Sequence, residues 1–217
     1  MEFWHLIGRG VDKRDIVLDD KDRVRFIHDL YVFNDQNPTP NFILPHRHEN
    51  LRKRKMLVDI HTFCLMNNHY HILVTERVEG GISLFMRKLN MGYTKYFNER
   101  YERSGALWQG KYRKVLIERD AHFLYIPFYV HLNPLDYIYP EWRSGKVKAP
   151  QKALQSLLEY RWSSHLDYLG VKNFPSIICK DIFNPILGTR KTYEEKIIKL
   201  VQTPDLIQGS EVIEYQN

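Results

Sequence analysis

Two apolar runs that flank Asn67-Asn68 constrain the fold of this chain most strongly. Residues 56–65 and 69–75 are rich in β-branched and aromatic side chains. Asparagine tolerates the positive φ values that a tight turn requires. The sequence therefore predicts two antiparallel strands joined by a short turn, which is a β-hairpin.

The second strand of this hairpin begins with two histidines, His69 and His71. Side chains of a strand alternate between its faces, so both imidazoles point to one face, while Tyr70, Ile72 and Val74 point to the other and can be buried. The two histidine Cα atoms are about 7 Å apart at the usual strand rise, so the rings can share one metal ion. A pair of solvent-facing histidines is the alternative interpretation.

The remaining hydrophobic pattern predicts an α+β fold. A first strand at residues 3–7 ends at Gly8-Arg9-Gly10, and Asp19-Asp20 begins a helix. Further elements are expected as helices at residues 82–100 and 121–132, with Asp120 as a cap, a strand at 115–117, and helical segments within 151–168 and 193–201. This order predicts a ferredoxin-like, four-stranded antiparallel sheet with helices on one face. We expect residues 1–140 to form this domain and residues 141–217 to form a helical C-terminal extension and tail.

The composition favours a nucleic-acid partner without requiring one. The chain of 217 residues has a net charge of +6 and a pI near 9.2, with 14 Tyr and 11 Phe. Basic clusters beside aromatic rings suit single-stranded nucleic acid. Cys64 and Cys179 are the two cysteines, and Cys64 is expected to be a buried thiol. We expect a cytoplasmic protein with no signal peptide and no membrane partner, because no apolar run reaches membrane-spanning length.

A second group of polar side chains lies on the expected helix at residues 121–132. Tyr125, Tyr129 and Asn133 are spaced four residues apart, so they share one helical face that can look onto the two histidines. Spacing alone leaves a packing or stacking role open for Tyr129. Pro127 removes a backbone donor inside this helix, so the sequence predicts a kink there. His131 faces away from Tyr129 and Asn133.

Three segments, taken in order, resemble the single-tyrosine HUH transposases, and most of all the REP-associated tyrosine transposases. The segments are Asn67-Asn68-His69-Tyr70-His71-Ile72-Leu73-Val74, Ser104-Gly105-Ala106-Leu107-Trp108-Gln109-Gly110-Lys111-Tyr112 and Tyr129-Val130-His131-Leu132-Asn133-Pro134. Weaker similarity extends the resemblance to about residues 3–170.

The resemblance implies metal-dependent cleavage and rejoining of single-stranded DNA, and thus DNA transposition. By this resemblance His69 and His71 bind Mg²⁺ or Mn²⁺, Asn133 supplies a third ligand, and Tyr129 is the nucleophile that forms a 5′-phosphotyrosine link. The implied partner is single-stranded or hairpin DNA, bound by a monomer or a homodimer. The residues expected to contact nucleic acid are Arg9, Arg14, Arg52, Lys53, Arg54, Arg87, Lys88, Trp108, Lys111 and Arg113.

Two other functions compete with this one. A module on the same fold could bind a DNA or RNA hairpin without cutting it. A zinc hydrolase would need a third strong ligand and an activated water, and the sequence offers no such ligand in the expected places. Tyr125 is the rival nucleophile, because a kink at Pro127 could turn it inward.

Overall fold

Four antiparallel strands form one sheet in the computed structural model, which describes residues 1–37 and 54–203. The strands are β1 (Trp4–Arg9), β2 (Val58–Leu65), β3 (His69–Glu76) and β4 (Arg113–Leu116). Their order is β2-β3-β1-β4, so β1 and β2 enclose β3, as in a split βαβ unit. The hairpin is confirmed, with Leu65 opposite Tyr70 and the backbone N–H of Met66 donating to the His69 carbonyl at 2.8 Å.

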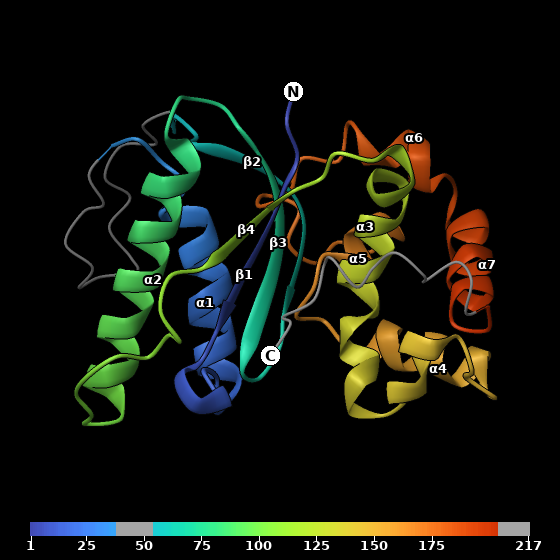
Figure 1. Cartoon of the computed structure of the whole chain (residues 1–217), viewed down its shortest axis with the longest axis horizontal. Coiled ribbons are helices and arrows are strands. Elements are labelled where there is room, and N and C mark those ends of the chain that lie inside the picture. The colour runs from blue at the N-terminus through green and yellow to red at the C-terminus, as the bar shows by residue number, and fades with distance from the viewer. Residues whose placement is uncertain (38–53, 204–217) are drawn as a thin grey trace.

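Helices lie on both sides of this sheet (Figure 1). The helices are α1 (Asp20–Val32), α2 (Gly81–Arg100), α3 (Asp120–Leu132), α4 (Pro150–Glu159), α5 (His165–Tyr168), α6 (Phe183–Leu187) and α7 (Arg190–Leu200), with 3₁₀ turns at η1 (Val11–Lys13), η2 (Asn133–Tyr137) and η3 (Pro140–Ser144). The pair α1 and α2 packs on one face, as the ferredoxin-like prediction requires. The opposite face is covered by α3 and the C-terminal extension, which the sequence pattern did not reveal.

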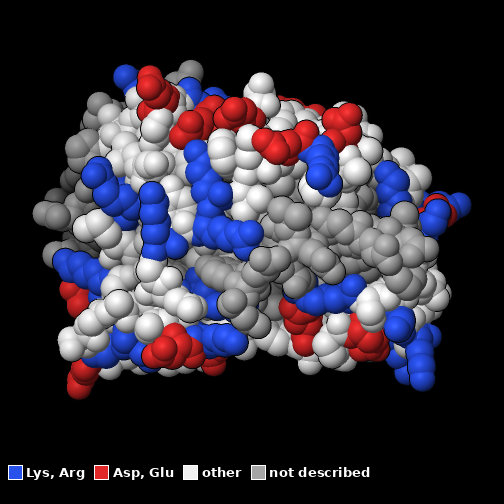
Figure 2. Space-filling view, in the orientation of Figure 1, with Lys and Arg blue, Asp and Glu red and all other residues white. Residues whose placement is uncertain are grey.

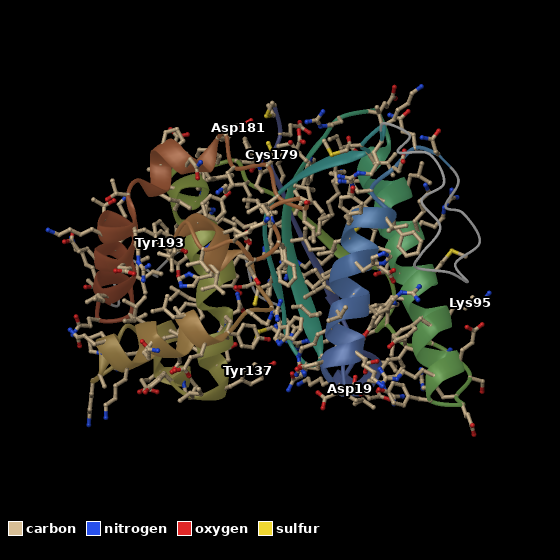
Figure 3. The ribbon with its side chains drawn as sticks, turned by 180° about the vertical axis from the view of Figure 1, so that it is seen from behind. Asp19, Lys95, Tyr137, Cys179, Asp181 and Tyr193 are labelled. Carbon is tan, nitrogen blue, oxygen red and sulfur yellow. The ribbon has the colours of Figure 1, made fainter. Side chains whose placement is uncertain are left out.

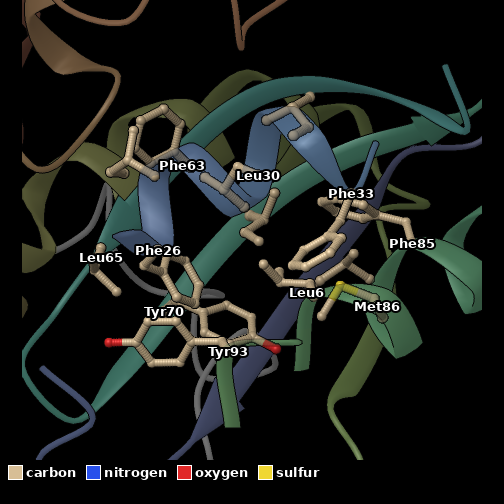
Figure 4. Close-up of a cluster of buried hydrophobic side chains, with 14 of the residues drawn as sticks. Leu6, Phe26, Leu30, Phe33, Phe63, Leu65, Tyr70, Phe85, Met86 and Tyr93 are labelled. Carbon is tan, nitrogen blue, oxygen red and sulfur yellow. The ribbon is translucent and has the colours of Figure 1, made fainter. Parts of the chain in front are cut away.

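The first core lies between the sheet and the helices α1 and α2 (Figure 4). Tyr70, Ile72 and Val74 are buried in it, as the alternation of β3 predicts. Gly8 lets the Tyr70 ring cross β1, because a Cβ atom at Gly8 would lie 2.3 Å from that ring. The strand β1 therefore passes through Gly8 and ends at Arg9, two residues later than predicted.

The second core joins α3 to residues on both sides of the predicted domain boundary. Leu73 of β3, Tyr129 of α3, Trp142 and Tyr193 all belong to it. Backbone bonds also attach the extension to the outer edge of β2: Leu65 N–H donates to the residue 162 carbonyl at 2.9 Å, and the residue 179 N–H donates to the residue 60 carbonyl at 2.7 Å. The extension therefore shields an edge strand.

The helix ends agree with the sequence in part. The Asp19 carboxylate caps α1 by accepting from the Asp22 N–H at 3.1 Å. Asp120 is the first residue of α3 and not its cap, since Arg119 holds the cap position without a side-chain bond. The helix α3 continues through Pro127 to Leu132. Within the described residues, no helix is long and apolar enough to cross a membrane.

A candidate site of histidines, a tyrosine and an arginine

His69 and His71 project from β3 onto the face that α3 covers. Their ring centroids are 5.0 Å apart, and their exposed fractions are 8% and 4%. Because β1 is the neighbour of β3, Arg9 lies opposite His69 in register and Ile7 lies opposite His71. The predicted sharing of one face is thus confirmed, and the alternative of a solvent-facing pair is wrong because the pair is buried.

A third histidine, His5, completes this group from β1. Its Nε2 lies 2.9 Å from Nδ1 of His71, and the two rings stack with centroids 5.0 Å apart. His5 is fully buried, and its Nδ1 has no hydrogen-bond partner among the described residues. Sequence reasoning missed His5, because its nearness to His71 depends on the pairing of β1 with β3.

The three imidazoles are neutral at pH 7. Burial, assisted by Arg9 and Arg143, lowers the pKa of His69 to about 3. Burial, assisted by Arg113, lowers the pKa of His5 to about 3, and burial with the surrounding charges holds the pKa of His71 well below its ordinary value. Neutral imidazole is the form that binds metal ions.

The hydrogen bonds of the two β3 histidines also suit a metal ion. Nδ1 of His69 donates to the Asn68 Oδ1 at 2.6 Å, so Nε2 of the neutral ring carries the lone pair. Nδ1 of His71 is bonded to His5, which leaves Nε2 as its ligating atom. Metal-binding histidines generally bond their second nitrogen to a neighbouring group in this way. The pair therefore fits a divalent ion.

Tyr129 of α3 lies directly against the rings of His71 and His5. Its ring centroid is 5.7 Å from that of His71 and 5.9 Å from that of His5, both edge to face, and its exposed fraction is 1%. Tyr125 lies one helical turn away and is half-buried, with its ring centroid 6.2 Å from that of Tyr129. In the described part of the chain, Tyr129 is the α3 tyrosine whose ring contacts the histidines.

Asn133 follows α3 and is fully buried. Its Nδ2 donates to the Tyr129 carbonyl at 2.7 Å, and its Oδ1 accepts from Nη2 of Arg143 at 3.2 Å. No cluster of three or more His, Cys, Asp or Glu side chains arranged for a metal ion occurs in residues 1–37 and 54–203. The Asn133 amide therefore stays the predicted third ligand of a metal ion held by His69 and His71.

Arg143 reaches this site from η3 in the extension. Its guanidinium carbon lies 5.7 Å from the Tyr129 ring centroid and 4.7 Å from the Trp142 ring. Burial works to lower the pKa of Arg143, but hydrogen bonds to Asp136 and Tyr129 outweigh it and raise that pKa. Sequence reasoning missed Arg143, since it lies outside every recognised motif in a segment without periodicity.

The predicted nucleic-acid residues separate into distinct places. Arg9 on β1 and Arg113 on β4 lie near the histidines, and their charges act on His69 and His5. Figure 2 shows Lys and Arg side chains gathered over the part of this view that α2 and β4 occupy. Arg14, Arg87 and Lys111 are exposed, whereas Arg52 and Lys53 lie outside the described residues.

Three other predicted contacts are engaged within the fold. The guanidinium of Arg54 lies 3.5 Å from the Tyr31 ring centroid and donates to the Tyr31 carbonyl. Lys88 donates to two carbonyl groups of the segment after α1. Trp108 packs its ring on the first core and donates from Nε1 to the Asn90 carbonyl at 3.1 Å. Their role toward nucleic acid stays a prediction.

Part of the chain is similar to a known protein family. Residues 47–133 match the family described as IS200-like transposases, and the matched segment holds both β3 histidines, Tyr129 and Asn133. This match confirms the resemblance inferred from the motifs.

One solved structure shows a similar fold. It is a REP-associated tyrosine transposase bound to a REP hairpin, with a TM-score of 0.49 and 13% sequence identity over 83% of this chain and 87% of that chain. A search of the curated proteins found no significant sequence match.

Proposed function

We propose that this transposase-family protein cleaves and rejoins single-stranded DNA through a covalent bond to Tyr129. The observation that carries the proposal is the contact between Tyr129 and His71. The two residues come from elements far apart in sequence, yet their ring centroids are 5.7 Å apart within one chain. A phenol beside the neutral imidazole of His71, which shares one strand face with His69, is a suitable arrangement for a metal-assisted nucleophile.

In the proposed reaction, the Tyr129 oxygen attacks the phosphorus of a phosphodiester. A bond forms between this oxygen and phosphorus, and the bond from phosphorus to the 3′ oxygen breaks. The phenol loses its proton and the 3′ oxygen takes one up, so no further reactant is needed. Because the new phosphotyrosine ester replaces an ester of similar kind, the step can run backwards with a 3′-hydroxyl from another strand.

The histidines would act by binding and orientation. His69 and His71 would hold Mg²⁺ or Mn²⁺ through Nε2, with Asn133 as the proposed third ligand. When bound, the ion would neutralise charge on the phosphate and lower the barrier to attack by an oxygen nucleophile. Imidazole suits Mn²⁺ better than Mg²⁺, so we expect Mn²⁺ to bind more tightly in vitro.

The proposed DNA partner is a single strand that folds into a hairpin, as expected for a transposase of the REP-associated type. Arg9 and Arg113 lie close enough to the histidines to influence their ionisation, so a phosphate at the pair would meet two further cations. Arg residues recognise phosphate through a planar fork of donors. The monomeric or dimeric state of the protein stays a prediction.

A hairpin-binding module without cleavage activity is the second candidate. The exposed fraction of Tyr129 is 1%, which also suits a tyrosine that only packs. The two functions differ in one outcome, which is the cutting of DNA. Labelled single-stranded DNA from the ends of the protein's own locus should be cleaved with Mn²⁺ and left intact with EDTA. Binding without any cleavage would support the second candidate.

A further inference from the structure

Arg143 belongs to the extension, beyond the family match that ends at residue 133. Its Nε and Nη2 donate to the two carboxylate oxygens of Asp136 at 2.9 and 2.7 Å. The Trp142 indole N–H donates to the same carboxylate at 2.7 Å. A planar guanidinium bonded in this bidentate way has a fixed orientation.

This orientation places the Arg143 charge at the reacting group. Arg143 forms a hydrogen bond with Tyr129, whose one polar side-chain group is the phenolic hydroxyl. It also donates to Asn133 Oδ1 at 3.2 Å, and its charge acts on both His69 and His71. The exposed fraction of its side chain is 31%, so Arg143 is partly open to solvent.

We propose that Arg143 is a catalytic residue that orients the Tyr129 oxygen and binds the phosphate which that oxygen attacks. This inference rests on the proposed function. Negative charge shifts onto the non-bridging oxygens as the fifth bond to phosphorus forms, and a preorganised guanidinium stabilises that charge. Arg143 keeps its protons throughout, so the bonds made and broken are those of the Tyr129 reaction. The extension would thus supply part of the catalytic site.

A purely structural role for Arg143 is the rival explanation. The ion pair with Asp136 could simply hold η3 against η2. The two roles can be separated because both Arg143 and Asp136 can be replaced by neutral residues. Arg143→Gln removes the charge, and the double variant Arg143→Gln/Asp136→Asn also removes the carboxylate that would be left without its partner.

The test measures the rate of adduct formation at saturating hairpin DNA with Mn²⁺, the Kd for that DNA, and the Tm. Arg190→Gln is the matched control, because Arg190 also pairs with a carboxylate in the extension but is 56% exposed on α7. We expect Arg143→Gln to lower the rate by about 100-fold or more, with a smaller change in Kd. Arg143→Lys should retain part of the rate, because it keeps the charge but loses the fork. Arg190→Gln should react as the wild type does.

The double variant decides between the roles. A catalytic Arg143 predicts that the double variant folds, with a Tm at or near that of the wild type, and remains as slow as Arg143→Gln. Recovery of the rate in the double variant, or a wild-type rate in Arg143→Gln, would overturn the proposal for Arg143. The proposed function would still stand in that case if the wild type formed its adduct at Tyr129. Absence of any wild-type adduct would overturn both.

Discussion

Nε2 of His5 lies 2.9 Å from Nδ1 of His71, and the two rings are stacked at 16°. This bond between β1 and β3 fixes the orientation of the His71 ring, and it leaves Nε2 of His71 as the atom that would bind a metal ion. Removal of a residue that orients a metal ligand in this way commonly weakens metal affinity by about 10- to 100-fold.

We therefore predict that His5→Leu weakens Mn²⁺ binding by about 10- to 100-fold. Leucine fills much of the same volume but cannot bond to His71, whereas His5→Gln should keep part of the affinity. Isothermal titration with Mn²⁺ measures the effect without any reaction. His28→Ala on α1 is the control, since its side chain is 47% exposed on the other side of the sheet. Unchanged Mn²⁺ affinity in His5→Leu would show that the bond has no role in metal binding.

Removal of either β3 histidine should abolish cleavage and preserve the fold. His69→Ala and His71→Ala each remove one proposed ligand, while Tyr70, Ile72 and Val74 keep the burial of β3 on the first core. Circular dichroism should show native helix and strand content in both variants. Loss of folded structure in both would instead assign the pair a structural role.

The stability of the protein should fall in mild acid. Burial, assisted by Arg190, lowers the pKa of His165 to about 3 from the ordinary 6.5, and His165 bonds to Tyr193 inside the extension. Figure 3 labels Tyr193 among the helices of the extension. Between these two pKa values the unfolded chain binds a proton that the folded chain does not. The free energy of unfolding therefore increases with pH in this range, and it decreases as the pH falls below 6.5. One such histidine accounts for about 2 kcal/mol between pH 6.5 and pH 5.

Thermal melts at pH 7 and pH 5 check this prediction. The wild type should melt at a lower temperature at pH 5, and His165→Leu should show a smaller difference between the two pH values. Met91→Ala on α2 is the control, because this side chain is 68% exposed and has no group that binds a proton, so the variant should keep the full wild-type difference. An equal pH dependence in His165→Leu would mean that this residue does not titrate as its burial requires.

Hairpin DNA should bind more tightly than plain duplex, and salt should weaken the binding. Arg113→Gln is expected to lower the affinity and to reduce the slope of log K against log salt by about 1, because one phosphate contact is lost. Arg87→Gln should have less effect, since α2 packs with Tyr70 and Ile72 on the face of the sheet opposite the histidines. Fluorescence anisotropy at several salt concentrations measures both quantities. Tighter binding to plain duplex at the same salt would contradict the prediction.

Local sequence patterns predicted much of the fold because the relevant forces are local. The alternation of β3 puts His71 and Tyr70 on opposite faces of the sheet. The Asn67-Asn68 turn makes β3 the antiparallel neighbour of β2. The helical spacing that grouped Tyr129 with Asn133 agrees with the bond from Asn133 Nδ2 to the Tyr129 carbonyl. Each of these inferences needs only the geometry of one element or one turn.

The rest of the site depends on contacts between distant segments. His5 is a neighbour of His71 only because β1 pairs with β3, and no periodicity within β1 reveals this. Arg143 reaches Tyr129 through a 3₁₀ turn held by Asp136, in a segment that carries no regular pattern. Arg9 and Arg113, whose charges act on His69 and His5, were predicted, but the sequence alone could not separate them from Lys88, which is engaged within the fold.

Mass spectrometry of the trapped adduct tests the central claim most directly. Wild-type protein, Tyr129→Phe and Tyr125→Phe are each incubated with single-stranded hairpin DNA and Mn²⁺, and the modified peptide is sequenced. Because phenylalanine removes only the hydroxyl, packing should be nearly unchanged. We expect DNA attached to Tyr129 in the wild type and in Tyr125→Phe, and no adduct in Tyr129→Phe, which should still bind DNA and metal. DNA attached to Tyr125 or to any other residue would contradict the account.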